Sequence, residues 1–270
     1  MSEPVAESVT DLVLSAHDIT VGYGAEPVLR DLRVDLPRGR VTTIIGPNGC
    51  GKSTLVRVLS RLLRPSAGEV RLDGVPLQTF RGRQLAARLS MLPQNPLAPE
   101  GMTVGDLVAR GRQPHQPWYR QWSPEDEEIA AEAMRHTGVD ELAEWPLDEL
   151  SGGQRQRAWI AMTLAQQTDL MILDEPTTHL DLAHAVEVLD VVVGLRRHAG
   201  KSVVLVLHDL SLAARYSDHL VVLDRGGLVV EGPPAEVMTE PMLASVFGLK
   251  AHVFPDPVAG LPTVVPASHA

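Results

Sequence analysis

The chain is poor in cysteine, in net positive charge and in long apolar runs. It has 270 residues and a single cysteine, Cys50. One cysteine cannot close an internal disulfide, which fits a reducing compartment. The formal net charge is -10. Nucleic-acid partners are held largely by Lys and Arg on phosphates, so we expect no nucleic acid among the partners.

Signals for export and for a membrane span are also missing. The sequence begins Met1-Ser2-Glu3-Pro4, without the basic start and apolar stretch of a secretory signal. Apolar runs such as Val203 to Leu207 are far shorter than the roughly 18 residues that a membrane helix needs. The sequence therefore predicts a chain that does not cross a membrane, and it leaves attachment through another subunit open.

What the chain does contain is a glycine-rich loop between a strand and a helix. The apolar run Val41 to Ile45 precedes the loop, and Leu55 to Leu59 follow it. The spacing G-x-x-x-x-G-K-S is that of a phosphate-binding loop, whose backbone amides and helix end face an anion. Lys52 can reach the outer phosphates, and the Ser53 hydroxyl can ligate Mg²⁺. A chance glycine turn is disfavoured by the flanking strand and helix, so we expect a nucleoside triphosphate site.

A second pattern is an apolar strand that ends in two acids. Leu170 to Leu173 lead directly into Asp174 and Glu175. Open α/β sheets bind ligands at the carboxyl ends of their strands. Asp174 is placed to hold Mg²⁺ through water, and Glu175 to act as general base toward the attacking water. Two acids after a strand also occur as a plain turn or helix cap, but a phosphate loop in the same chain favours the functional interpretation.

The third pattern is a serine and two glycines before an apolar helix. Ser151 can cap that helix, and the glycines leave bare amides at its start, which makes a second anion site. A Ser-Gly-Gly turn alone is a common linker fragment. Here it continues into a polar run and precedes the acidic pair by about twenty residues. The full segment is Leu150-Ser151-Gly152-Gly153-Gln154-Arg155-Gln156-Arg157.

With these three motifs the chain resembles the ATP-binding cassette (ABC) ATPases, from about residue 12 to 265. The resemblance implies an α/β fold: a phosphate-loop core with a mostly parallel sheet, an N-terminal antiparallel β part and an inserted helical subdomain at about 95–165. It implies one domain with flexible termini at 1–11 and 266–270. Short antiparallel strands are expected between Leu12 and Leu36. The Walker A loop then comprises Gly46, Pro47, Asn48, Gly49, Cys50, Gly51, Lys52, Ser53 and Thr54.

The resemblance also assigns roles to residues outside the loop. Gln94 matches the Q-loop glutamine, a ligand of Mg²⁺ and water, and His208 matches the switch histidine. Asp181 matches the D-loop, which crosses a dimer interface, and Tyr23 matches the aromatic that stacks on adenine. Ser151, Gly152, Gly153 and Gln154 are the signature that contacts ATP from a second copy. The implied cofactors are ATP and Mg²⁺, with catalytic roles for Glu175, His208 and Gln94, and metal ligands Ser53, Gln94 and Asp174.

Within the family the chain is similar to the ATPases of bacterial iron(III)-siderophore importers, whose wider group carries vitamin B12 and haem. The family implies ATP hydrolysis between two head-to-tail copies, on the cytoplasmic face of the cell membrane. It implies two transmembrane permease subunits and, indirectly, an extracytoplasmic substrate-binding protein. A soluble ABC ATPase, for instance of iron–sulfur cluster assembly, remains an alternative, and an exporter cassette is disfavoured because exporters commonly fuse cassette and membrane domain.

Two further groups of residues have weaker interpretations. His115, His179 and His184 have no metal-ligand spacing, so we expect them in solvated loops and helices. The aromatic segment Trp118 to Trp122 either borders a groove for a permease helix or forms a locally packed turn. The identity of the transported chelate is carried by other chains and is not encoded here.

Overall fold

The computed structural model describes residues 12–24, 26–116 and 122–267. The chain divides into two compact units. Unit 1 combines the sequence up to Phe80 with the segment from His208 onward, and unit 2 runs from Arg81 to Leu207. The predicted flexible ends are 1–11 and 266–270, of which residues 1–11 and 268–270 lie outside the described residues. The last strand ends at Pro266, one residue beyond the predicted domain end.

An antiparallel sheet of unit 1 is built from the N-terminal segment, with the strand order β2-β1-β4-β5. The short strands expected before residue 22 are in fact one long strand, β1, because the chain passes through an irregularity rather than a turn. Asp18 has a φ of 53°, and the register with β2 shifts between Ala16 and Ile19. The strands are β1 (Leu12–Val21), β2 (Leu29–Pro37), β4 (Ala67–Leu72) and β5 (Val75–Pro76).

The second sheet region of unit 1 places the phosphate loop. Strand β3 (Val41–Ile45) is buried at every position and pairs in parallel with β9 (His219–Asp224). Strand β10 (Gly227–Gly232) pairs antiparallel with β9. The remaining elements are α1 (Lys52–Leu59), α7 (Leu210–Tyr216), α8 (Pro234–Val237), α9 (Glu240–Phe247), β11 (Ala251–Pro255) and β12 (Pro262–Pro266).

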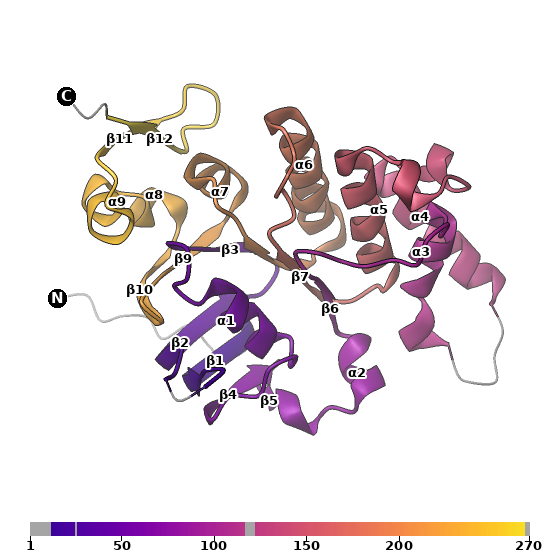
Figure 1. Ribbon diagram of the computed structural model, residues 1–270, viewed down its shortest axis with the longest axis horizontal. Coiled ribbons are helices and arrows are strands. Elements are labelled where there is room, and N and C mark those ends of the chain that lie inside the picture. The colour runs from indigo at the N-terminus through magenta and orange to yellow at the C-terminus, as the bar shows by residue number, and fades with distance from the viewer. Residues whose placement is uncertain (1–11, 25, 117–121, 268–270) are drawn as a thin grey trace. The chain divides into compact units, whose positions relative to one another are not determined.

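Unit 2 holds three parallel strands in the order β6-β7-β8 together with the helical part (Figure 1). Strands β7 and β8 are buried at every position, as expected for parallel strands covered on both faces. The α/β class with a mostly parallel core, an antiparallel part and helices is thereby confirmed. The elements are α2 (Gly82–Ala86), β6 (Leu89–Leu92), α3 (Val104–Arg110), α4 (Pro124–Thr137), α5 (Gly152–Ala165), β7 (Leu170–Asp174), α6 (Leu182–Ala199) and β8 (Ser202–Val206).

A buried ion pair stabilises the helical part of unit 2. The guanidinium of Arg112 donates to Asp126 at 3.0 Å, to the carbonyl of Ala165 at 2.8 Å and to Gln167 at 2.9 Å. Asp126 also accepts a hydrogen bond from the hydroxyl of Ser123, which caps α4. Both charged side chains are buried, so each charge needs these partners. The segment that begins α4 is thus tied to the end of α5.

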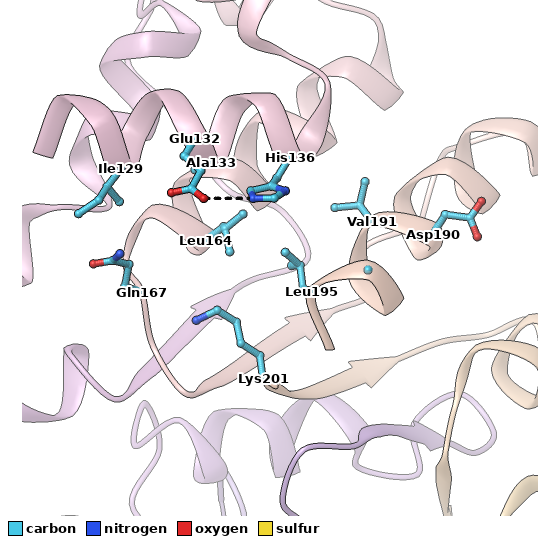
Figure 2. A pocket seen from close by; sticks show the side chains of 11 residues that line it. Ile129, Glu132, Ala133, His136, Leu164, Gln167, Asp190, Val191, Leu195 and Lys201 are labelled. Carbon is cyan, nitrogen blue, oxygen red and sulfur yellow. Dashed lines mark ion pairs between the residues drawn. The ribbon is translucent and has the colours of Figure 1, made fainter. Parts of the chain in front are cut away.

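A pocket of about 960 Å³ opens between α4, α5 and α6 (Figure 2). Its walls combine apolar residues such as Ile129, Leu164 and Val191 with polar ones, and its lining includes the ion pair between Glu132 and His136. None of the predicted site residues lines it. The pocket is therefore separate from the site residues of unit 2 and has both signs of charge around it.

Candidate functional site

The phosphate loop connects β3 to α1 and depends on glycine backbone geometry. Gly49 has a φ of 79°, and Gly51, the residue before α1, has a φ of 107°. Residues other than glycine rarely adopt either of these backbone conformations. A Cβ on Gly51 would lie 2.5 Å from Cδ2 of the buried Leu29, whereas a Cβ on Gly49 would meet nothing within 4 Å. The loop is thus a tight backbone cradle whose amides precede a helix start, the geometry that binds phosphate.

Lys52 supplies the positive charge of this cradle. Its Nζ donates to the carbonyl oxygen of Gly46 at 2.8 Å and to that of Pro47 at 3.0 Å. The side chain is 5% exposed, so the ammonium lies inside the loop. Ser53 is half-buried and Thr54 is buried at the first turn of α1. The predicted loop residues are therefore assembled on one turn and one helix start.

Cys50 and Tyr23 have different environments in unit 1. Burial raises the pKa of the Cys50 thiol, which keeps this side chain a neutral filler of the loop. Tyr23 is 60% exposed, and its hydroxyl accepts a hydrogen bond from Arg57 of α1 at 3.1 Å. An exposed ring with a fixed hydroxyl is suited to stacking on a base. His208 is also exposed, at the start of the segment of unit 1 that precedes α7.

In unit 2 the two acids and the Q-loop glutamine come together. Asp174 ends β7 and is buried, and Glu175 follows with a φ of 54°. Gln94 donates to Oε2 of Glu175, and the hydroxyl of Thr178 donates to the same oxygen at 3.1 Å. Two donors on one oxygen orient the carboxylate, as a general base requires. The sequence motifs do not include Thr178, because a threonine three residues after an acid is also common in ordinary turns.

The signature forms the N-terminus of α5. The Ser151 hydroxyl accepts from the backbone amide of Gln154 at 3.3 Å, and the Gln154 side chain accepts from the amide of Ser151 at 3.0 Å. This reciprocal capping box confirms the predicted cap. Ser151 and Gly152 are exposed, and α5 has 14 residues, so its positive end faces outward.

Asp181 begins α6 as its N-cap. Its Oδ1 accepts from the backbone amide of His184 at 2.9 Å and lies 2.7 Å from Nδ1 of the same residue. These hydrogen bonds lower the pKa of Asp181.

His115 contacts the carbonyl of Gln166 at 2.7 Å, and His179 is exposed with a φ of 66°. Of the aromatic segment Trp118 to Trp122, residues 118–121 lie outside the described residues, and Trp122 is 43% exposed.

Each unit supplies donor groups of a kind that a triphosphate with Mg²⁺ requires. A serine hydroxyl, a carboxylate and a glutamine amide are oxygen ligands of the hard kind that Mg²⁺ prefers. The glycine cradle and Lys52 provide donors for phosphate oxygens in unit 1, and Asp174 supplies a buried carboxylate in unit 2. These features define a phosphate-loop nucleoside triphosphatase. The ABC transporter family model matches residues 29–178, more than half of the chain, and the chain belongs to that family as an ATP-hydrolysing subunit.

Curated relatives extend the similarity over almost the whole length. The ferric enterobactin transport ATP-binding protein FepC of Escherichia coli (strain K12) is 48% identical over 98% of this chain and 96% of its own. The achromobactin transport ATP-binding protein CbrD of Dickeya dadantii (strain 3937) is 48% identical over 94% of each chain. Among solved structures, a metal-chelate type ABC transporter in an inward-facing conformation superimposes with a TM-score of 0.83 at 26% identity, covering 96% of this chain and 98% of that one.

Proposed function

We propose that this chain hydrolyses ATP to drive import of an iron(III)-siderophore complex. The observation that carries the substrate class is the near-full-length identity to two ATP-binding proteins of siderophore transport. The structure supports the ATPase part through the phosphate cradle of unit 1 and the oriented carboxylate of unit 2. The iron chelate itself does not touch this subunit in the proposal.

Each residue has a role in the proposed reaction. Lys52 and the loop amides bind the outer phosphates and offset their charge, and Tyr23 stacks on the adenine. Glu175 accepts a proton from the attacking water while Thr178 and Gln94 hold its carboxylate. Ser53, Gln94 and Asp174 would hold Mg²⁺, which neutralises charge on the phosphate oxygens when bound. His208 assists at the γ-phosphate.

The proposal includes a dimer in which ATP lies between two copies. The chain carries two helix ends suited to phosphate: the loop before α1 and the outward-facing start of α5. The loop before α1 already contains a lysine, Lys52. At the start of α5, Ser151 and Gly152 are exposed and belong to no phosphate loop. Head-to-tail pairing would place the signature of one copy on the ATP of the other, with Asp181 at the interface. ATP then favours the closed dimer by mass action, and hydrolysis reopens it.

A permease would dock on the segment that follows the Q-loop. A pocket of about 230 Å³ is lined there by Leu97, Pro99, Leu147 and Trp159. Leu97 is 93% exposed beside this pocket, so a partner could bury its whole side chain. An amphipathic helix of a permease would bury it.

Among the described residues no helix of this chain is long and apolar enough to span a bilayer. The proposed location is the cytoplasmic face of the membrane, peripherally, with the extracytoplasmic binding protein acting only through the permease.

The test is uptake of radio-iron siderophores by cells that lack this gene. The cells are complemented with the wild-type gene or with Glu175→Gln, and labelled cobalamin and haem are supplied in parallel. Iron uptake restored by the wild type alone supports the proposal and ties uptake to hydrolysis. Restoration of cobalamin or haem uptake instead would move the chain to that branch. No restored uptake, with no polytopic membrane protein co-purifying, would favour a soluble ATPase.

A further inference from the structure

The signature turn and the D-loop residues are packed directly against each other in unit 2. A Cβ on Gly153 would lie 2.8 Å from Cδ2 of His184, 3.1 Å from its Cγ and 3.2 Å from its Cβ. A Cβ on Gly152 would lie 3.4 Å from Cδ2 of Leu180. Gly153 is buried by this contact, whereas Gly152 remains exposed. The start of α5 therefore rests on the start of α6, and His184 occupies the space that a side chain at 153 would need.

His184 is itself fixed by the D-loop aspartate. Its Nδ1 lies 2.7 Å from Oδ1 of Asp181, and its backbone amide donates to the same oxygen at 2.9 Å. Asp181 thus orients the ring while acting as the N-cap of α6. One imidazole links the two segments that the proposed dimer presents to the second copy: the amides at 152–153 and the D-loop.

We propose that His184 is a positioning residue for the ATP-bound dimer. The inference rests on the proposed function and deepens it. His184 holds the Gly152-Gly153 turn and Asp181 in one arrangement, so that both reach the nucleotide of the second copy together. It touches neither ATP nor Mg²⁺. Without the ring, the start of α5 loses its support, and Asp181 loses one of its two hydrogen bonds from residue 184.

The shape of the side chain allows its two contacts to be separated. In asparagine, Nδ2 and Oδ1 take the places of Nδ1 and Cδ2 of the imidazole, so His184→Asn keeps a donor for Asp181 and an atom against Gly153. In leucine, two methyl groups take those places, so His184→Leu keeps the packing and loses the donor. His184→Ala loses both. The expected order of function is wild type, then Asn, then Leu, then Ala.

The experiment uses the full chain with Glu175→Gln, so that bound ATP persists, and measures dimerisation by analytical ultracentrifugation at rising ATP concentration. We expect His184→Ala to weaken ATP-dependent dimerisation about 3- to 10-fold, because each copy in the dimer loses one solvent-exposed ionic hydrogen bond. Binding of a fluorescent ATP analogue to the monomer should stay within about twofold, because the phosphate loop is intact. His184→Asn should recover most of the dimerisation.

Three results would overturn the inference. They are unchanged dimerisation of His184→Ala, equal behaviour of the Asn and Ala variants, or a parallel fall in monomer ATP affinity that marks general misfolding. If the Glu175→Gln parent itself stays monomeric with ATP, the dimer proposal fails and the inference falls with it. If the parent dimerises and only the order of the 184 variants is wrong, the inference fails and the dimer proposal stands.

A second measurement tests the packing without nucleotide. Gly153→Ala should lower the thermal unfolding midpoint with His184 present and lower it less with His184→Ala, because the smaller side chain frees the space. Additive effects of the two substitutions would show that Gly153 and His184 do not share that space, and would overturn the packing step.

Discussion

At the scale of single residues, the phosphate loop offers a matched pair of glycines. Gly49 and Gly51 both have positive φ values, 79° and 107°, but only Gly51 faces a neighbour, the buried Leu29. We expect Gly49→Ala to cost about 1–2 kcal/mol of unfolding free energy from backbone strain alone. Gly51→Ala should cost roughly 1–3 kcal/mol more from overpacking. Urea unfolding without nucleotide measures both, and equal losses would contradict the role given to Leu29.

Glu175 carries the sharpest prediction on activity. Its carboxylate is buried and held by Thr178 and Gln94. We expect Glu175→Gln to bind ATP normally and to hydrolyse it about 10²–10⁴-fold more slowly, because general-base help is lost. This factor corresponds to roughly 3–5 kcal/mol of barrier. Single-turnover hydrolysis and ATP binding measure the two properties, and near-normal turnover would remove Glu175 from the role.

The residue types of the site were predictable because each motif has fixed local spacing, but their contacts were not. Gln94 and Glu175 lie in separate motifs, and 81 positions separate them in the sequence. Only the folded unit 2 shows that they share a hydrogen bond. Thr178 and His184 act through contacts with Glu175 and Gly153. Neither contact has a spacing signal strong enough to separate it from an ordinary turn or helix residue.

At the scale of elements, the buried ion pair between Arg112 and Asp126, which links α4 to α5, leads to a prediction about stability. Burial alone would raise the pKa of Asp126, but the hydrogen bonds from Arg112 and Ser123 lower it overall. Asp126→Asn leaves a buried guanidinium without its counter-charge. We expect a loss of about 3–5 kcal/mol at neutral pH by urea unfolding. The ion pair of Arg157 with Glu187, whose side chain is 53% exposed, gives the control, and Glu187→Gln should cost about 0–1 kcal/mol.

The pH dependence of this ion pair follows from the sign of the shift. A carboxyl whose folded pKa is lowered contributes stability that is complete above its unfolded pKa, about 3.9 for aspartate. That contribution is lost as the pH falls through the lower folded value of Asp126. The difference between wild type and Asp126→Asn should therefore be constant above about pH 5 and shrink below about pH 4. A difference that grew on acidification would contradict the assignment.

Elements were predictable where burial or caps dominate the sequence pattern. The buried strands β3, β7 and β8 and the acidic start of α4 follow the expected signals closely. Strand β1 differs from the expectation. Asp18 and its neighbours are typical turn residues, but the chain continues through them as a strand with a register shift. Pairing with β2 and β4 on both sides keeps the strand whole, and such tertiary support has no local signal.

At the scale of the whole molecule, the proposed transport function depends on a partner subunit that responds to ATP hydrolysis by this chain. Leu97 and the pocket beside it form the surface proposed for that partner. The pocket belongs to the same unit as Gln94 and Glu175, and three positions separate Gln94 from Leu97 in the sequence. A force on this segment would thus reach the hydrogen bond between Gln94 and Glu175 through a short stretch of backbone.

The corresponding prediction is that Leu97→Glu uncouples transport from ATP hydrolysis. A carboxylate in place of a buried leucine at an interface costs several kcal/mol unless it is paired, so the permease should dissociate. Siderophore uptake by complemented cells and co-purification with membrane proteins should both be lost, whereas the purified subunit should keep its basal ATPase activity. Leu62→Glu is the control, since Leu62 is 68% exposed in unit 1 and lies outside this surface. Normal uptake with Leu97→Glu, or equal loss with Leu62→Glu, would exclude this segment as the docking surface.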